Sequence, residues 1–139
     1  MWTYTNSIVT SASKEAVWSV IADVEKWKDW FIPIYSSQLR GNFDEQGIVD
    51  LNFEDKMQLQ LSFDEFTHMD NFTLHSALKL SEMLLRFELE QEDDMTVVAV
   101  SVEFKGTSWP FFSYMLGTIF RKRLAKSLEN LVQLAEKKS

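Results

Sequence analysis

The sequence has no cysteine, only two prolines and four glycines, and no long apolar run among its 139 residues. Without cysteine the chain has neither disulfides nor thiolate metal ligands, which excludes a disulfide-stabilised scaffold and fits a reducing compartment. No window approaches the roughly 18 apolar residues that a membrane-spanning helix needs, and no basic run precedes an apolar stretch at the N-terminus. We therefore expect a cytoplasmic protein with no integral membrane segment.

Positive charge is also scarce. The chain has 14 Lys and Arg residues against 21 Asp and Glu residues, which gives a formal net charge of −7. On average this charge repels phosphate backbones and anionic membranes, so we expect no nucleic-acid partner. Apolar residues make up 45% and charged residues 25%, as in a globular protein, and the length predicts a single domain over residues 1–139.

Alternation of apolar and polar residues is the clearest pattern that is present. Val49, Leu51 and Phe53 alternate with polar residues, as in a strand with one buried face. The same alternation recurs at residues 57–63, 72–80, 85–89 and 98–104. Turn-forming residues lie between these segments, at 44–47, 54–56, 68–71, 79–82 and 92–94. Such short links predict antiparallel neighbours, and weaker patterns predict two more strands at 3–10 and 34–40.

Helical patterns occur in two places. Ser13 is a suitable N-cap for a helix over residues 14–22, and Asp23 for a second short helix that carries Trp27, Trp30 and Phe31 and ends by Pro33. A long helix is predicted over residues 111–137, with Ser108 as cap and Pro110 in the first turn. Its first half is apolar almost all round, which is more apolar surface than one contact with a sheet requires.

The order of these elements predicts an α+β fold. A curved antiparallel sheet of about seven strands would wrap around the long C-terminal helix, with two short helices between the first two strands. A strongly bent sheet around a helix leaves room for a hollow between them.

Residues 13–30, the order of elements and the strand end at residues 104–106 resemble the START/Bet v 1-like helix-grip superfamily, including its polyketide cyclase/dehydrase and lipid-transport group. The resemblance implies a cavity between the sheet and the long helix, open near the second short helix and the first turns of the last one. Members hold lipids, sterols, polyketides, quinones or plant hormones there, and some are cyclases. The resemblance therefore implies binding or transport of a small hydrophobic ligand, with no cofactor.

The candidate ligand-binding residues are those expected at the mouth, on the floor and on the helix face of this cavity. They are Trp30, Phe31, Leu59, Leu61, Phe63, Leu74, Ser76, Phe87, Leu89, Phe112, Met115, Ile119 and Phe120. The alternative is that these side chains simply fill the core. Ser76 could hydrogen-bond a ligand hydroxyl or carbonyl group, but serine more often bonds backbone. Phe111 and Phe112 cannot share one helix face, so at least one should meet solvent, ligand or partner.

Catalysis has little support in the sequence. The inner positions of the five clear strands carry no charged or imidazole side chain, and His68 and His75 lack the spaced ligands of a metal site. Tyr4, Tyr35 and Tyr114 are the candidates for proton transfer if the protein is a cyclase/dehydratase-like enzyme. We regard that enzyme as the second hypothesis, after ligand binding.

A third hypothesis is a protein-interaction domain with an aromatic patch of Trp30, Phe31, Phe111 and Phe112. A basic block follows on the last helix, at Arg121, Lys122, Arg123 and Lys126. It suits either a lipid headgroup or acidic partner, or a solvated face paired with the acids of the sheet.

Overall fold

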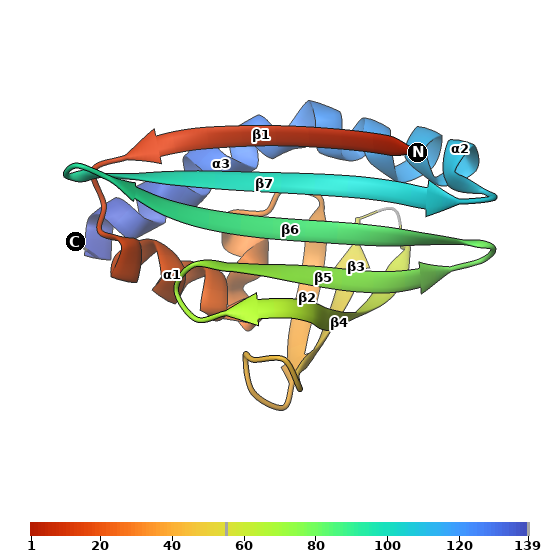
Figure 1. The fold of residues 1–139 in the computed structure, drawn as a ribbon, viewed down its shortest axis with the longest axis horizontal. Coiled ribbons are helices and arrows are strands. Elements are labelled where there is room, and N and C mark those ends of the chain that lie inside the picture. Colours follow the sequence, from red (N-terminus) through yellow and green to blue (C-terminus); the bar gives the residue numbers. More distant parts are fainter. Residues whose placement is uncertain (55, 139) are drawn as a thin grey trace.

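In a computed structural model, which describes residues 1–54 and 56–138, seven antiparallel strands form one sheet with the order β1-β7-β6-β5-β4-β3-β2 (Figure 1). The strands are β1 (Trp2–Thr10), β2 (Ile34–Arg40), β3 (Ile48–Phe53), β4 (Gln58–Thr67), β5 (Asn71–Leu78), β6 (Ser81–Glu92) and β7 (Met95–Gly106). The alternating segments therefore predicted the strands, except that Leu80 lies in the β5–β6 turn with a φ of +60°. Asp55, in the turn predicted at 54–56, lies outside the described residues.

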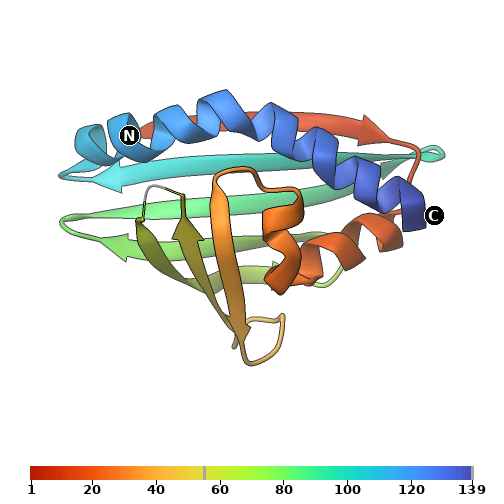
Figure 2. The same cartoon turned by 180° about the vertical axis from the view of Figure 1, so that it is seen from behind.

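The first and last strands pair with each other, from Trp2 opposite Phe104 to Thr10 opposite Thr96. Figures 1 and 2 show that the sheet is strongly curled, since β2 and β3 run steeply across the direction of β6 and β7. The C-terminal helix lies along the concave face of this sheet (Figure 2). The predicted α+β helix-grip architecture is confirmed.

The two short helices lie between β1 and β2. Helix α1 (Lys14–Ala22) begins as predicted, since Ser13 Oγ accepts a hydrogen bond from the Ala16 amide at 3.1 Å. The second is a 3₁₀ helix, η1 (Val24–Asp29), and the prediction that it carries Trp30 and Phe31 was wrong. The chain leaves the helix at Trp30 because the Ile32 amide bonds to Ser127 Oγ on the last helix, and because Ile32 precedes a proline.

The last helical segment is interrupted, contrary to prediction. It consists of α2 (Trp109–Phe112), a π-helical turn η2 (Ser113–Gly117) and α3 (Thr118–Lys138). The Ser108 hydroxyl does not cap it but donates to the Lys79 carbonyl oxygen. The wider π turn lies where the helix passes the Trp2 ring, and a Cβ on Gly117 would be 2.9 Å from that ring.

Aromatic side chains fill much of the concave face. The rings of Trp30 and Phe31 are stacked with centroids 5.0 Å apart, and those of Phe72 and Phe87 are stacked at 4.7 Å. Trp27 lies 5.8 Å from both Trp30 and Phe87, and its Nε1 donates to a backbone oxygen of α1 at 2.7 Å. The high aromatic content is thus used mainly to close the wide space between the curled sheet and the helices.

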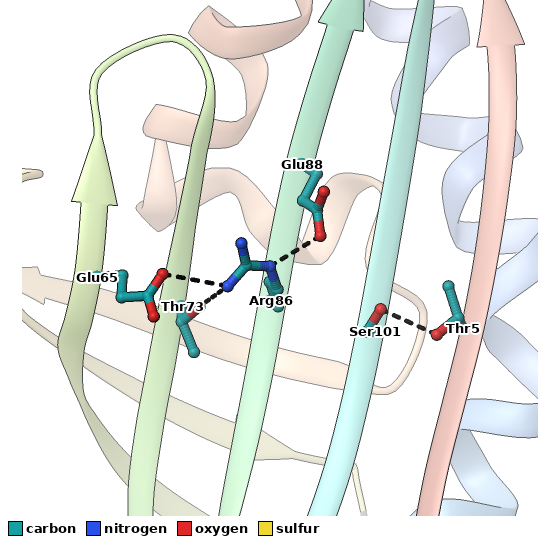
Figure 3. Close-up of polar contacts among 6 residues, drawn as sticks. All are labelled: Thr5, Glu65, Thr73, Arg86, Glu88 and Ser101. Carbon is teal, nitrogen blue, oxygen red and sulfur yellow. Dashed lines mark hydrogen bonds and ion pairs between the residues drawn. The ribbon is translucent and has the colours of Figure 1, made fainter.

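The convex face of the sheet is polar. Arg86 on β6 donates to Glu88 at 2.8 Å and reaches across to Glu65 and Thr73 at 3.2 Å (Figure 3). The hydrogen bond to Glu88 raises the pKa of the Arg86 guanidinium further above its already high ordinary value. The sheet therefore has one dry and one wet face, as the alternation predicts.

Candidate functional site

A pocket lies at the end of the sheet where α2 begins. The start of β4, the end of β5 and helix α2 meet there, and the pocket has a volume of about 350 Å³. We call it the α2 pocket, and its lining is Met57, Gln58, Leu59, Gln60, Ser76, Ala77, Leu78, Lys79 and Phe112. The resemblance implies an opening near both the second short helix and the first turns of the last helix, and this pocket lies beside the latter, with no residue of η1 in its lining.

Strands β4 and β5 and helix α2 position the residues that line this pocket. Leu59 on β4 and Ser76 on β5 both point to the concave face, and their exposed fractions are only 8% and 3%. Phe112 is the last residue of α2 and packs partly against the core, whereas its neighbour Phe111 is 60% exposed. The adjacent phenylalanines are thus divided between the pocket and the solvent, as their positions on a helix require.

A second pocket of about 260 Å³, the α3 pocket, lies on the other side of the helix start. It is lined by Ile32, Pro33, Phe53, Glu54, Thr118, Ile119, Lys122 and Arg123. Ile119 is in the first turn of α3, and Phe53 is the end of β3. Met115, which lies between Phe112 and Ile119 in sequence, is half-buried and lines neither pocket.

The other predicted ligand-binding residues lie in the core and line neither of these pockets. They are Trp30, Phe31, Leu61, Phe63, Leu74, Phe87, Leu89 and Phe120. That any of them contacts a ligand stays a prediction. The prediction of a surface patch that includes Trp30 and Phe31 was wrong, because their stacked rings are buried, with exposed fractions of 1% and 0%.

Some lining residues were missed by the sequence analysis. Met57, Gln58 and Lys79 flank the turns at 54–56 and 79–82, whereas Lys122 and Arg123 belong to the basic block that the sequence analysis considered for a lipid headgroup. A signal was available, because antiparallel strands joined in order bring these two turns to the same edge as the start of the last helix. Residues beside those turns were therefore candidates by topology.

Two other depressions are more polar. One of about 260 Å³ at the C-terminal end of α3 is lined mostly by charged side chains, namely Asp23, Lys26, Asp29, Lys137 and Lys138, with Val20, Trp30 and Leu134. Another of about 560 Å³ over the ends of β2, β3 and β4 includes Tyr35, Ser36, Asn52, Glu54, Lys56 and Gln58 beside Phe53. Both carry more charged side chains than the α2 pocket, whose lining has Lys79 as its charged residue.

The interior has little chemistry for proton transfer. Among the described residues the buried polar side chains are Thr10, Thr73, Ser76, Thr96 and Ser127, and no ionisable side chain is buried. Tyr35 and Tyr114 are 70% and 82% exposed, and Tyr4 is half-buried beneath the Arg121 guanidinium. The three candidate tyrosines therefore lie outside the core.

The two histidines are engaged elsewhere. His68 packs edge-on against Trp18 at 5.5 Å, and His75 Nε2 lies 2.6 Å from Glu82 Oε2 on the wet face. That hydrogen bond is the main reason why the pKa of the Glu82 carboxyl is below its ordinary value. The described part of the chain contains no group of three or more His, Cys, Asp or Glu residues that could hold a metal ion.

No helix among the described residues has the length and apolar character needed to cross a membrane.

Comparison with known proteins gives one family match. Residues 1–136 match the family described as polyketide cyclase/dehydrase and lipid transport. No curated protein matches the chain in sequence.

Solved structures of the same fold include enzymes and proteins of other descriptions. The Zhui aromatase/cyclase from Streptomyces sp. R1128 superposes with a TM-score of 0.79 at 14% identity, covering 98% of this chain and 94% of that one. A START superfamily protein from Mycobacterium smegmatis gives 0.69 at 16% identity, covering 94% and 97%. Norcoclaurine synthase from Thalictrum flavum, in complex with dopamine and hydroxybenzaldehyde, gives 0.71 at 14% identity, covering 99% and 88%. At these identities the likeness concerns the fold, and it confirms the predicted START/Bet v 1-like resemblance.

Proposed function

The chain belongs to the polyketide cyclase/dehydrase and lipid transport family, and from this premise we propose that it binds a small hydrophobic molecule in the α2 pocket. The observation that carries the proposal is the lining of that pocket. Met57, Leu59, Leu78 and Phe112 surround a space of about 350 Å³, and Ser76 is a polar group on its concave side.

The driving force is removal of apolar surface from water. At roughly 25 cal/mol per Å², a ligand that loses about 200 Å² of apolar surface gains about 5 kcal/mol before ordering costs. The lining offers few groups that could orient a ligand by hydrogen bonds, chiefly Ser76 and the amides of Gln58 and Gln60. We therefore expect broad specificity for apolar molecules.

Binding is better supported than proton transfer. General acid–base catalysis needs a titratable side chain within hydrogen-bond reach of the reacting atoms. The core side of the α2 pocket provides Ser76 as its polar side chain, and the described residues include no buried ionisable group. The titratable side chain in the α2 lining is Lys79, which is exposed, so a cyclase/dehydratase activity there would have to use this lysine or act without a titratable group.

The proposal is tested with the fluorescent apolar probe 1-anilinonaphthalene-8-sulfonate and two neighbouring variants. Phe112→Ala removes a wall of the α2 pocket and should raise the probe's dissociation constant about tenfold, the effect of about 1.4 kcal/mol of lost contact. Phe111→Ala is the matched control, because this adjacent ring is 60% exposed and does not line the pocket, and it should change the constant less than about twofold. Equal effects of the two variants would refute binding at this pocket.

A further inference from the structure

Exposed large hydrophobic side chains gather at the end of the molecule where α2 begins. Leu80 is 70%, Phe111 60% and Tyr114 82% exposed, and Met1 at the start of β1 is 72% exposed. The turn that holds Leu80 is tied to α2, because the Ser108 amide donates to the Leu80 carbonyl oxygen at 3.2 Å. Figure 2 shows the N-terminus, α2 and the β5–β6 turn at this same end. Such a grouping of exposed apolar side chains marks an interaction surface.

Cations without acidic partners lie beside this apolar group. Arg121, Lys122 and Arg123 follow on α3, and Lys79 precedes Leu80 in the turn. In the described parts of the chain, none of these four side chains lies within ion-pair distance of a carboxylate. The expectation that the basic block pairs with the acids of the sheet was therefore wrong. Only Lys126 of that block is paired, with Glu129 on the same helix at 3.4 Å.

The apolar and basic side chains share one helix face. Tyr114, Thr118, Arg121 and Lys122 border one depression beside Trp2, and all four are exposed, as is Phe111. Arg121 is also held in place, with its guanidinium 5.7 Å from the Trp2 ring. Aromatic side chains followed by cations are the arrangement that suits the boundary between apolar lipid tails and anionic headgroups.

We propose that this surface, which consists of Leu80, Phe111, Tyr114, Arg121 and Lys122, docks on an anionic lipid bilayer. The apolar side chains enter the headgroup region and the cations meet lipid phosphates. The net charge of −7 repels an anionic bilayer on average, but acids such as Glu65 and Glu88 are on the convex face of the sheet and are bound to Arg86. The local charge at the docking surface has the opposite sign from the molecule as a whole.

A bilayer fits this surface better than a second copy of the chain does. Two copies joined through it would bring the adjacent cations Arg121 and Lys122 of each copy together. The apolar side chains also come from separate elements, a turn and two helical segments. The fluid headgroup region of a bilayer adapts to such separate contacts.

The test is sedimentation of the protein with vesicles of phosphatidylcholine alone or with about 30% phosphatidylglycerol, whose headgroup supplies the negative charge. We expect at least about tenfold stronger partition onto the anionic vesicles, reduced by added salt. The double variant Phe111→Ser with Tyr114→Ser should lower that partition at least about tenfold, since two apolar side chains no longer insert. Val9→Ser is the control, because Val9 is 56% exposed at the opposite end of β1, and it should have no effect.

A second pair of variants tests the charges. Arg121→Gln with Lys122→Gln should weaken partition onto anionic vesicles about tenfold, whereas Lys137→Gln with Lys138→Gln, at the other end of α3, should leave it unchanged. Thermal unfolding of each variant reports whether it is folded. Failure of the wild-type protein to bind anionic vesicles, or equal losses in test and control variants, would overturn the proposal. So would a dimer that the Phe111/Tyr114 variant dissociates, since a second copy would then be the occupant.

Discussion

Trp27 and Trp30 lie three residues apart, and both rings are buried, yet only one indole N–H group has a partner. Trp27 Nε1 donates to the Ile21 carbonyl oxygen at 2.7 Å. Trp30 Nε1 is buried without a hydrogen-bond partner among the described residues. The sequence allows such rings to fill the space between sheet and helices, but it cannot assign hydrogen-bond partners to their N–H groups. Their partners are backbone atoms whose positions depend on the finished packing.

We therefore predict that the same substitution lowers the free energy of unfolding by different amounts at the two tryptophans. Both Trp27→Phe and Trp30→Phe remove ring volume from the core, but only the first also removes a buried hydrogen bond. We expect Trp27→Phe to lower the free energy of unfolding by about 1 kcal/mol more than Trp30→Phe, measured by chemical denaturation. If Trp30→Phe lowered the free energy of unfolding as much as Trp27→Phe or more, this result would contradict the assignment of the hydrogen bond to Trp27.

The candidate site was only partly predictable residue by residue. Leu59 and Ser76 were found because alternation assigns each to the concave face, and that is where they line the α2 pocket. Trp30 and Phe31 were expected at a mouth, since tryptophan suits a boundary between apolar and wet surroundings, but their rings pack on each other, and the Trp30 ring also packs on Phe87. Composition alone does not distinguish an aromatic side chain that seals a core from one that borders a pocket.

At the scale of elements, the strands were predictable and the interruption of the last helix was not. Alternation specifies which face of each strand is buried, so a strand is visible in the sequence even without its partners. The residues of η2, by contrast, are all compatible with an α-helix, and Gly117 is the only weak helix former among Ser113–Gly117. The π turn coincides with a tertiary contact, the Trp2 ring of β1 against Gly117.

This contact gives a prediction for Gly117→Ala. Alanine favours a helix by about 1 kcal/mol, but the new Cβ would lie 2.9 to 3.2 Å from three atoms of the Trp2 ring. Because that ring is held by Phe104 and Arg121, we expect a net loss of about 1 kcal/mol in the free energy of unfolding. In a Trp2→Ala background the same change should become stabilising. Stabilisation by Gly117→Ala with Trp2 present would show that the helix does not need the glycine there.

At the scale of the whole molecule, the order of the strands decides where a site can form. Consecutive antiparallel strands bring the turns near residues 54–58 and 79–82 to one edge, and β7 delivers the chain to α2 at that same edge. The opposite part of the concave face is closed by α1, η1 and the aromatic rings beneath them. The α2 and α3 pockets are therefore found where the sheet is least covered. The sequence predicts this edge through topology, but the volume of a pocket depends on side-chain packing.

The central claim is that an apolar molecule binds between α2 and the ends of β4 and β5. It is tested most directly by methyl NMR of the wild-type protein titrated with 1-anilinonaphthalene-8-sulfonate, whose rings shift the signals of methyl groups close to them. The account predicts saturable shifts at the methyl groups of Met57, Leu59 and Leu78, which line the α2 pocket, and none at Val20 and Leu134, which line the charged depression at the other end. Shifts confined to Val20 and Leu134, or absent from Met57, Leu59 and Leu78 at saturation, would contradict it.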